Sequence, residues 1–143
     1  MPEAAKTVIG FDFGTHWIGI AVGQTLTRQA RPLDALKARD WKAIERVLSA
    51  WMPQQLVVGL PLNLEGGAQE MTASAQRFGR RLEGRFGINT AMVDERLTTR
   101  EAYQVAIESG QMKTKPEIDS LAAVLITESW LRNHDQHADD GEI

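Results

Sequence analysis

The chain has 143 residues, with 16 Lys and Arg, 19 Asp and Glu, four Trp and no Cys. A chain of this length buries roughly two-thirds of its unfolded surface in one core, so we expect a single domain. The missing cysteine excludes disulfides, thiolate zinc sites, iron–sulfur clusters and a cysteine nucleophile. No stretch resembles a signal peptide or approaches the roughly 20 apolar residues of a membrane span, which predicts a cytoplasmic protein without membrane contact.

The charge is distributed unevenly along the chain. The last eleven residues hold four acids and neither Lys nor Arg, whereas the first 132 hold 16 basic against 15 acidic residues, a net charge of +1. We therefore expect an ordered core over about 6–132 and a solvated acidic tail over 133–143. Because the core is nearly neutral, any nucleic-acid site must be a local patch.

Three strands are predicted in the first third of the chain. Apolar and β-branched residues indicate strands over 7–13, 17–23 and 30–36. The three residues between the first two suit a hairpin. Pro32 cannot donate to a strand ladder, so the third strand is expected at an edge of the sheet.

Helices and strands alternate after that. Asp40 is a good N-cap for a helix that ends near Met52, and an apolar strand follows over 56–60. A longer helix is predicted over 69–86, with Gly87 as its C-terminal cap.

The last third is predicted to contain one strand and two helices. The strand covers 90–93, and a capping box opens a helix over about 98–109. The final helix begins at Glu117 or Ser120 and ends near Asn133. This order of elements predicts a mixed sheet flanked by helices, in the α/β class.

Acidic residues interrupt the apolar pattern at three places. Asp12 lies in an otherwise apolar strand, Asp94 and Glu95 follow a strand, and Asp119 heads the apolar face of the final helix. Buried carboxylates are costly unless they are paired or bind a metal. Converging carboxylates repel one another unless a divalent cation lies between them, and oxygen ligands favour Mg²⁺ or Mn²⁺.

Each acid also has a purely structural interpretation. Asp12 can bond the amides of the turn that follows it, Asp94 or Glu95 can pair with Arg96, and Asp119 can serve as an N-cap. Successive strand residues point to opposite faces, so only one of Asp94 and Glu95 can face a common site. The spacing does not indicate which one.

Basic residues gather near these acids and on the long helix. Arg77, Arg81 and Arg85 recur every four residues, which suits either a solvated helix face or a phosphate-binding stripe. Arg96 and Lys115 lie close in sequence to the acidic positions.

Four segments of the chain form one distinctive set in their order and spacing. They are Gly10-Phe11-Asp12-Phe13-Gly14-Thr15 with the following Ile18-Gly19-Ile20-Ala21-Val22, then Val58-Gly59-Leu60-Pro61-Leu62-Asn63, Asp94-Glu95-Arg96-Leu97-Thr98-Thr99, and Lys115 with Asp119-Ser120-Leu121-Ala122-Ala123. Together they resemble the YqgF/RuvX family of ribonuclease H-like nucleases. The resemblance spans about Lys6 to Leu131 and implies a ribonuclease H-like fold, with a five-stranded mixed sheet whose first three strands are antiparallel.

The same resemblance implies a function and a site. The implied activity is metal-dependent phosphodiester hydrolysis that matures the 5′ end of precursor 16S rRNA, free or in the small-subunit particle; an older family assignment is a Holliday junction resolvase acting on branched DNA. The catalytic and metal-binding residues would be Asp12, Glu95 and Asp119, with Mg²⁺ or Mn²⁺ as cofactor and one or two ions in the mechanism. The resemblance gives Asn63, Arg96 and Lys115 as substrate contacts. The spacing of Arg77 and Arg81 adds these two residues as further candidates, and we expect a monomer or weak homodimer.

Two other functions compete with this one. Residues 12–15 also resemble the first phosphate motif of actin-like ATPases, but those enzymes enclose the nucleotide with two such domains and this chain supplies one. The chain could also be an RNA-binding ribosome-assembly factor without catalysis. The acids weigh against that, because a pure RNA binder gains nothing from carboxylates beside phosphates.

Overall fold

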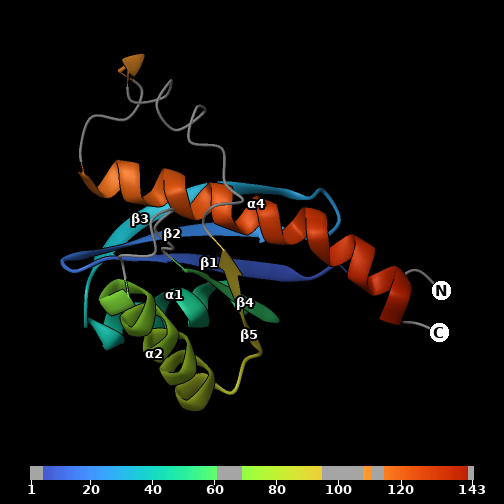
Figure 1. The fold of residues 1–143 in the computed structure, drawn as a ribbon, viewed down its shortest axis with the longest axis horizontal. Helices are drawn as coiled ribbons and strands as arrows, with labels where there is room; N and C mark the ends of the chain where they lie inside the picture. Colours follow the sequence, from blue (N-terminus) through green and yellow to red (C-terminus); the bar gives the residue numbers. More distant parts are fainter. Residues whose placement is uncertain (1–4, 61–68, 95–107, 111–114, 142–143) are drawn as a thin grey trace.

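A five-stranded mixed sheet with helices on both faces forms the protein (Figure 1). It is seen in a computed structural model that describes residues 5–60, 69–94, 108–110 and 115–141, without the side chains of 69–70, 115–118 and 134–141. The strand order is β3-β2-β1-β4-β5. Strands β1, β2 and β3 form an antiparallel meander, and β4 and β5 run parallel to β1.

The strands agree with the sequence prediction to within one residue at each end. Pro32 lies in an edge strand, as predicted, because β3 closes one side of the sheet. The strands are β1 (Thr7–Phe13), β2 (Trp17–Gln24), β3 (Gln29–Lys37), β4 (Gln55–Leu60) and β5 (Thr90–Asp94).

Helices α1 (Trp41–Trp51) and α2 (Gln69–Phe86) cover one face of the sheet. The main hydrophobic core lies between them and the sheet, and alternate β1 residues Ile9 and Phe11 point into it. Phe78 of α2 packs edge-on against Phe11, with ring centroids 5.6 Å apart. Gly87 ends α2 in the left-handed region, with φ of 66°, as its predicted role as a cap requires.

The first helix is capped as the sequence predicts. The Asp40 carboxylate accepts a hydrogen bond from the Ala43 amide at 3.1 Å. Replacing Asp40 by Ala is expected to lower the free energy of unfolding by about 1 kcal/mol, because that amide loses its acceptor. Urea denaturation would measure this against Asp34→Ala, which alters an exposed β3 residue. Equal stability of both variants would contradict the assignment.

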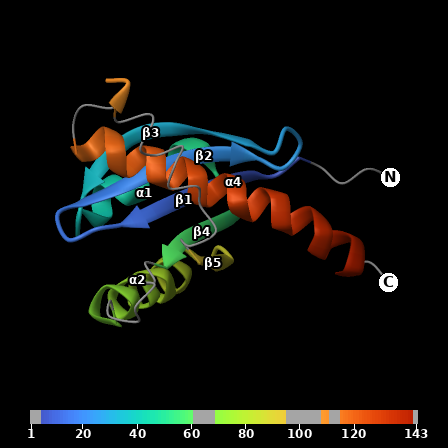
Figure 2. The same cartoon turned by 45° about the horizontal axis from the view of Figure 1, so that its top comes forward.

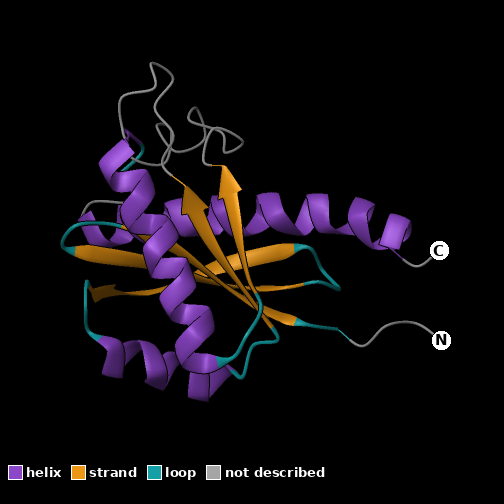
Figure 3. Cartoon of the chain, turned by 60° about the horizontal axis from the view of Figure 1, so that its bottom comes forward, coloured by secondary structure: helices purple, strands orange, loops and turns teal. Residues whose placement is uncertain are grey.

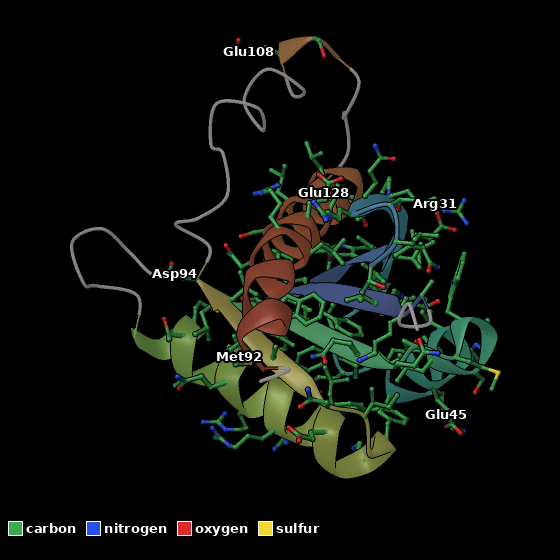
Figure 4. The ribbon with its side chains drawn as sticks, turned by 90° about the vertical axis from the view of Figure 1, so that its right-hand side faces the viewer. Arg31, Glu45, Met92, Asp94, Glu108 and Glu128 are labelled. Atoms are coloured by element: carbon green, nitrogen blue, oxygen red, sulfur yellow. The ribbon has the colours of Figure 1, made fainter. Side chains whose placement is uncertain are left out.

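Helix α4 (Lys115–Gly141) covers the opposite face. It approaches the strands closely because glycines lie beneath it at the points of contact. A Cβ at Gly10 would overlap the Thr127 hydroxyl, and one at Gly19 would overlap the backbone of Asp119. Glu128 also accepts a hydrogen bond from the Ala30 amide at 3.1 Å, which ties α4 to β3 (Figure 4).

The predicted end of the last helix is wrong. We expected it to end near Asn133, but α4 continues to Gly141 and runs past the sheet (Figure 2). No Gly or Pro lies between Glu117 and Asp140, so nothing in the sequence interrupts the helix before Gly141. The helix predicted over 98–109 lies almost entirely outside the described residues. In the described part of the chain, no helix is both long and apolar enough to span a bilayer.

Candidate active site

Asp12 faces the side of the sheet that α4 covers. Strand residues alternate between faces, and the even-numbered β1 residues point toward α4. Val8 belongs to a buried cluster with Ile126, and Gly10 lies beneath Thr127. Asp12 follows Gly10 by two residues and therefore shares this face, at the carboxyl end of the central strand.

Asp119 lies over the same part of the sheet. It is the fifth residue of α4, and only 5% of its surface is exposed. Its backbone lies directly above Gly19, and Gly19 is the antiparallel partner of Asp12. Directly opposed residues have Cα atoms about 4.5–5.5 Å apart, so Asp12 and Asp119 lie on one face at one end of the sheet. The alternative role of Asp119 as an N-cap is wrong, because the helix begins at Lys115.

Ser120 fixes this part of α4 on the sheet. Its hydroxyl donates to the Leu33 carbonyl at 2.8 Å and lies 3.4 Å from the Ile20 amide, which can donate to it. These groups lie where the β2–β3 register shifts, between Ile18 and Ile20. The bond to β3 orients the helix turn that contains Asp119. Sequence reasoning did not assign Ser120 this role, although a hydroxyl on an apolar helix face signals a buried partner.

Asp94 lies on the other face of the sheet. Val93 joins the buried cluster under α4, whereas Met92 packs into the core beneath α1 and α2. Asp94 pairs with Leu60 in the parallel register, and Leu60 also packs against that second core. Asp94 therefore ends β5 on the α2 side (Figure 4). Glu95 lies outside the described residues.

The carboxyl ends of the parallel strands meet at the edge that holds these acids. Strands β4 and β5 end side by side there (Figure 3), and β1 ends beside β4. The hairpin after β1 reaches the first turn of α2, where the Thr15 hydroxyl lies 3.9 Å from the Met71 sulfur. In open α/β sheets, ligands bind at this edge.

The structure brings together only part of the predicted site. Asp12 and Asp119 meet on the α4 face, whereas Arg77 and Arg81 are exposed on α2, across the sheet from them. Lys115 begins α4 and is described by its backbone alone. Two of the predicted substrate contacts, Asn63 and Arg96, fall outside the described residues.

The donor atoms suit a hard divalent cation. Asp12 and Asp119 supply carboxylate oxygens, which are the ligands that Mg²⁺ and Mn²⁺ prefer. Gly19, opposite Asp12, places no side chain beside that carboxylate. Among the described side chains, no group of three or more His, Cys, Asp or Glu is arranged to hold a metal ion. A metal site formed by three protein carboxylates would therefore have to include a residue outside this described set.

The protein has the ribonuclease H-like fold. This fold class is defined by the strand order, by the antiparallel meander and by the helix that places an acid beside the central strand. The model of the RuvX family, described as "Holliday junction resolvase", matches residues 6–133, and the chain belongs to this family.

Relatives and solved structures agree with this assignment. A "Putative pre-16S rRNA nuclease" of Pectobacterium carotovorum is 48% identical over 132 residues, covering 88% of this chain and 95% of the relative. One of the same name from Actinobacillus succinogenes is 49% identical over 134 residues, covering 90% and 96%. The structure "T. thermophilus RuvC in complex with Holliday junction substrate" matches with a TM-score of 0.57 at 18% identity, covering 90% of this chain and 96% of that one. At this identity, the structural likeness shows a shared fold.

Proposed function

We propose that this protein is a divalent-metal-dependent nuclease that cuts precursor 16S rRNA at the 5′ end of the mature sequence. The main support is the placement of Asp12 and Asp119 together on one sheet face, at the edge where such folds bind ligands. The relatives that are nearly half identical carry the matching name. The protein would then act in the cytoplasm as a single catalytic domain, a monomer or weak homodimer, on precursor rRNA or the small-subunit particle.

The third carboxylate of the proposed site is Glu95. Asp94 ends β5 on the α2 side of the sheet, across from Asp12 and Asp119. Strand alternation therefore favours its neighbour for the α4 side. Asp12, Glu95 and Asp119 would then hold Mg²⁺ or Mn²⁺.

The chain's own residues position the reacting groups. A bound divalent cation would supply charge neutralisation at the phosphate and a lowered pKa for attacking water. Asp12 stands on the rigid central strand, and Asp119 is held by the packing of α4, so neither carboxylate needs to move for reaction. Arg96, Lys115 and Asn63 would contact the phosphates or sugars of the substrate. Water attack at phosphorus with loss of the 3′-oxygen leaves a 5′-phosphate and a 3′-hydroxyl.

Replacing Asp94 and Glu95 by their amides, one at a time, tests which of the two is the metal ligand. Glu95→Gln is expected to lower the cleavage rate by at least about 100-fold, because a metal ligand should matter more than the groups that merely orient one. Asp94→Asn is expected to change the rate by less than about threefold, since its side chain lies on the other face. Single-turnover cleavage at saturating Mn²⁺ compares them. A larger loss in Asp94→Asn would reverse the assignment.

A substrate comparison tests the proposed function itself. Wild-type protein is incubated with Mg²⁺ or Mn²⁺ and either RNA spanning the mature 5′ end of 16S rRNA or a synthetic four-way DNA junction. We expect cutting of the RNA, dependent on the metal. Cutting of the junction alone would instead favour the resolvase activity in the family's description. If neither free substrate nor small-subunit particles carrying precursor rRNA are cut, the nuclease proposal fails in favour of a binding factor.

A further inference from the structure

We propose that an arginine stripe on α2 is a second RNA-binding surface, which holds a part of the substrate away from the bond being cut. The stripe consists of Arg77, Arg80, Arg81 and Arg85. This inference rests on the proposed function and adds to it the requirement for a long RNA.

The stripe faces away from the protein. Its four arginines are exposed, whereas Ala75, Phe78 and Leu82 on the other side of α2 are buried in the core. Among the described side chains of α2, Glu83 is the only acid. A protein with a net charge of −3 thus presents a concentrated positive surface on one helix, which suits a polyanion.

Arginine side chains suit phosphate recognition here. The planar guanidinium offers paired donors that match phosphate oxygens, which an ammonium group does not. Arg85 is held in place, because its guanidinium carbon lies 4.3 Å from the centre of the Trp41 ring. Such stacking lowers the entropy lost on binding while leaving the in-plane N–H donors available.

Gly84 leaves a position without a side chain in the stripe. It lies within the stripe, and a Cβ built there meets nothing within 4 Å. Packing therefore does not require glycine at this position, although glycine in a helix lowers stability relative to alanine. A missing side chain among exposed arginines lets a nucleic-acid backbone lie close against the helix.

Helix α2 begins at the edge of the sheet where β1 ends and carries the stripe away from it. Met71, in the first turn of α2, lies against Thr15 of the hairpin that follows β1. From Met71 to Arg85 the helix extends for about 20 Å at 1.5 Å per residue. RNA that reaches both the carboxylates and Arg85 must span at least this length, so a trinucleotide cannot engage both.

Binding measurements separate this surface from the catalytic site. All proteins in this comparison carry Asp12→Asn, and the one without further changes serves as the wild-type stripe. Its RNA affinity is compared with that of the Arg77→Glu/Arg81→Glu variant by fluorescence anisotropy in Mg²⁺. Two probes are used. One is a precursor RNA of about 60 nucleotides that contains a stem, and the other is a single-stranded trinucleotide. We expect the double variant to bind the long RNA at least about tenfold more weakly, with a salt slope reduced by about 1.5–2. The loss for the short strand should be much smaller.

Two further variants make the test decisive. Lys6→Glu/Arg132→Glu makes the same charge change at exposed positions outside α2 and should bind as wild type. Gly84→Leu should not lower the thermal melting temperature, yet it should weaken binding of the long RNA. Unchanged affinity in Arg77→Glu/Arg81→Glu, or an equal loss in the charge control, would overturn the proposal. This experiment measures RNA binding and not cleavage. Failure of the stripe proposal can therefore be told apart from failure of the nuclease proposal.

Discussion

Replacing Asp12 by Asn is expected to abolish cleavage while leaving the fold intact. The amide keeps the size of the side chain but loses the charge that binds a divalent cation. Loss of groups that only orient metal ligands costs about 10–100-fold, so loss of a ligand should cost at least about 100-fold. Stability should be unchanged or higher, because repulsion between two neighbouring carboxylates is removed. Single-turnover cleavage and thermal denaturation measure the two effects.

The control for this substitution is Asp34→Asn. Asp34 is exposed on the edge strand β3, so the same chemical change there should affect neither rate nor stability. Full activity in Asp12→Asn would remove this residue from the mechanism. Loss of activity together with unfolding would instead assign Asp12 a structural role.

Replacing Gly19 by Ala is expected to have the largest effect on stability. The added methyl group would overlap the backbone of Asp119 and lie 2.7 Å from the Ser120 nitrogen. Helix backbone cannot rotate away as a side chain can, so α4 must shift. Overpacking of this kind typically costs about 1–3 kcal/mol, and we expect a cost at or above the upper end. Urea denaturation measures it, and because Asp119 moves with the helix, cleavage should fall as well.

Gly84→Ala is the matched control. The same methyl group in open space on a helix should raise the free energy of unfolding by about 0.5–1 kcal/mol. If Gly19→Ala were as stable as the wild type and fully active, the close contact between β2 and α4 would not hold Asp119 in place.

Much of the fold follows from local sequence signals. Several strand bounds could be predicted within one residue because a Gly or Pro lies next to them, as Gly14 follows β1 and Pro61 follows β4. The end of α4 could not be predicted, because the four acids near the C-terminus suggested a solvated tail. Negative charge is unfavourable at a helix C-terminus, yet no residue there breaks the helix before Gly141.

The sequence singles out the acids of the candidate site but does not give their geometry. Asp12 and Asp119 stand out as acids in apolar patterns, and the structure places them together. The choice between Asp94 and Glu95 required the register of β5, which depends on packing against β4 rather than on spacing. Likewise, the sequence suggested that Arg77 and Arg81 contact phosphates but did not show that α2 lies across the sheet from the acids.

Direct measurement of Mn²⁺ binding tests the central claim, that acids on the α4 face form a metal site. Electron paramagnetic resonance would titrate free Mn²⁺ against wild type, Asp12→Asn, Asp119→Asn and the Asp34→Asn control. We predict specific binding by the wild type and the control, with affinity at least about tenfold weaker in each of the other two. Equal Mn²⁺ affinity in all four proteins, or no specific binding by the wild type even with substrate RNA present, would contradict the proposed site.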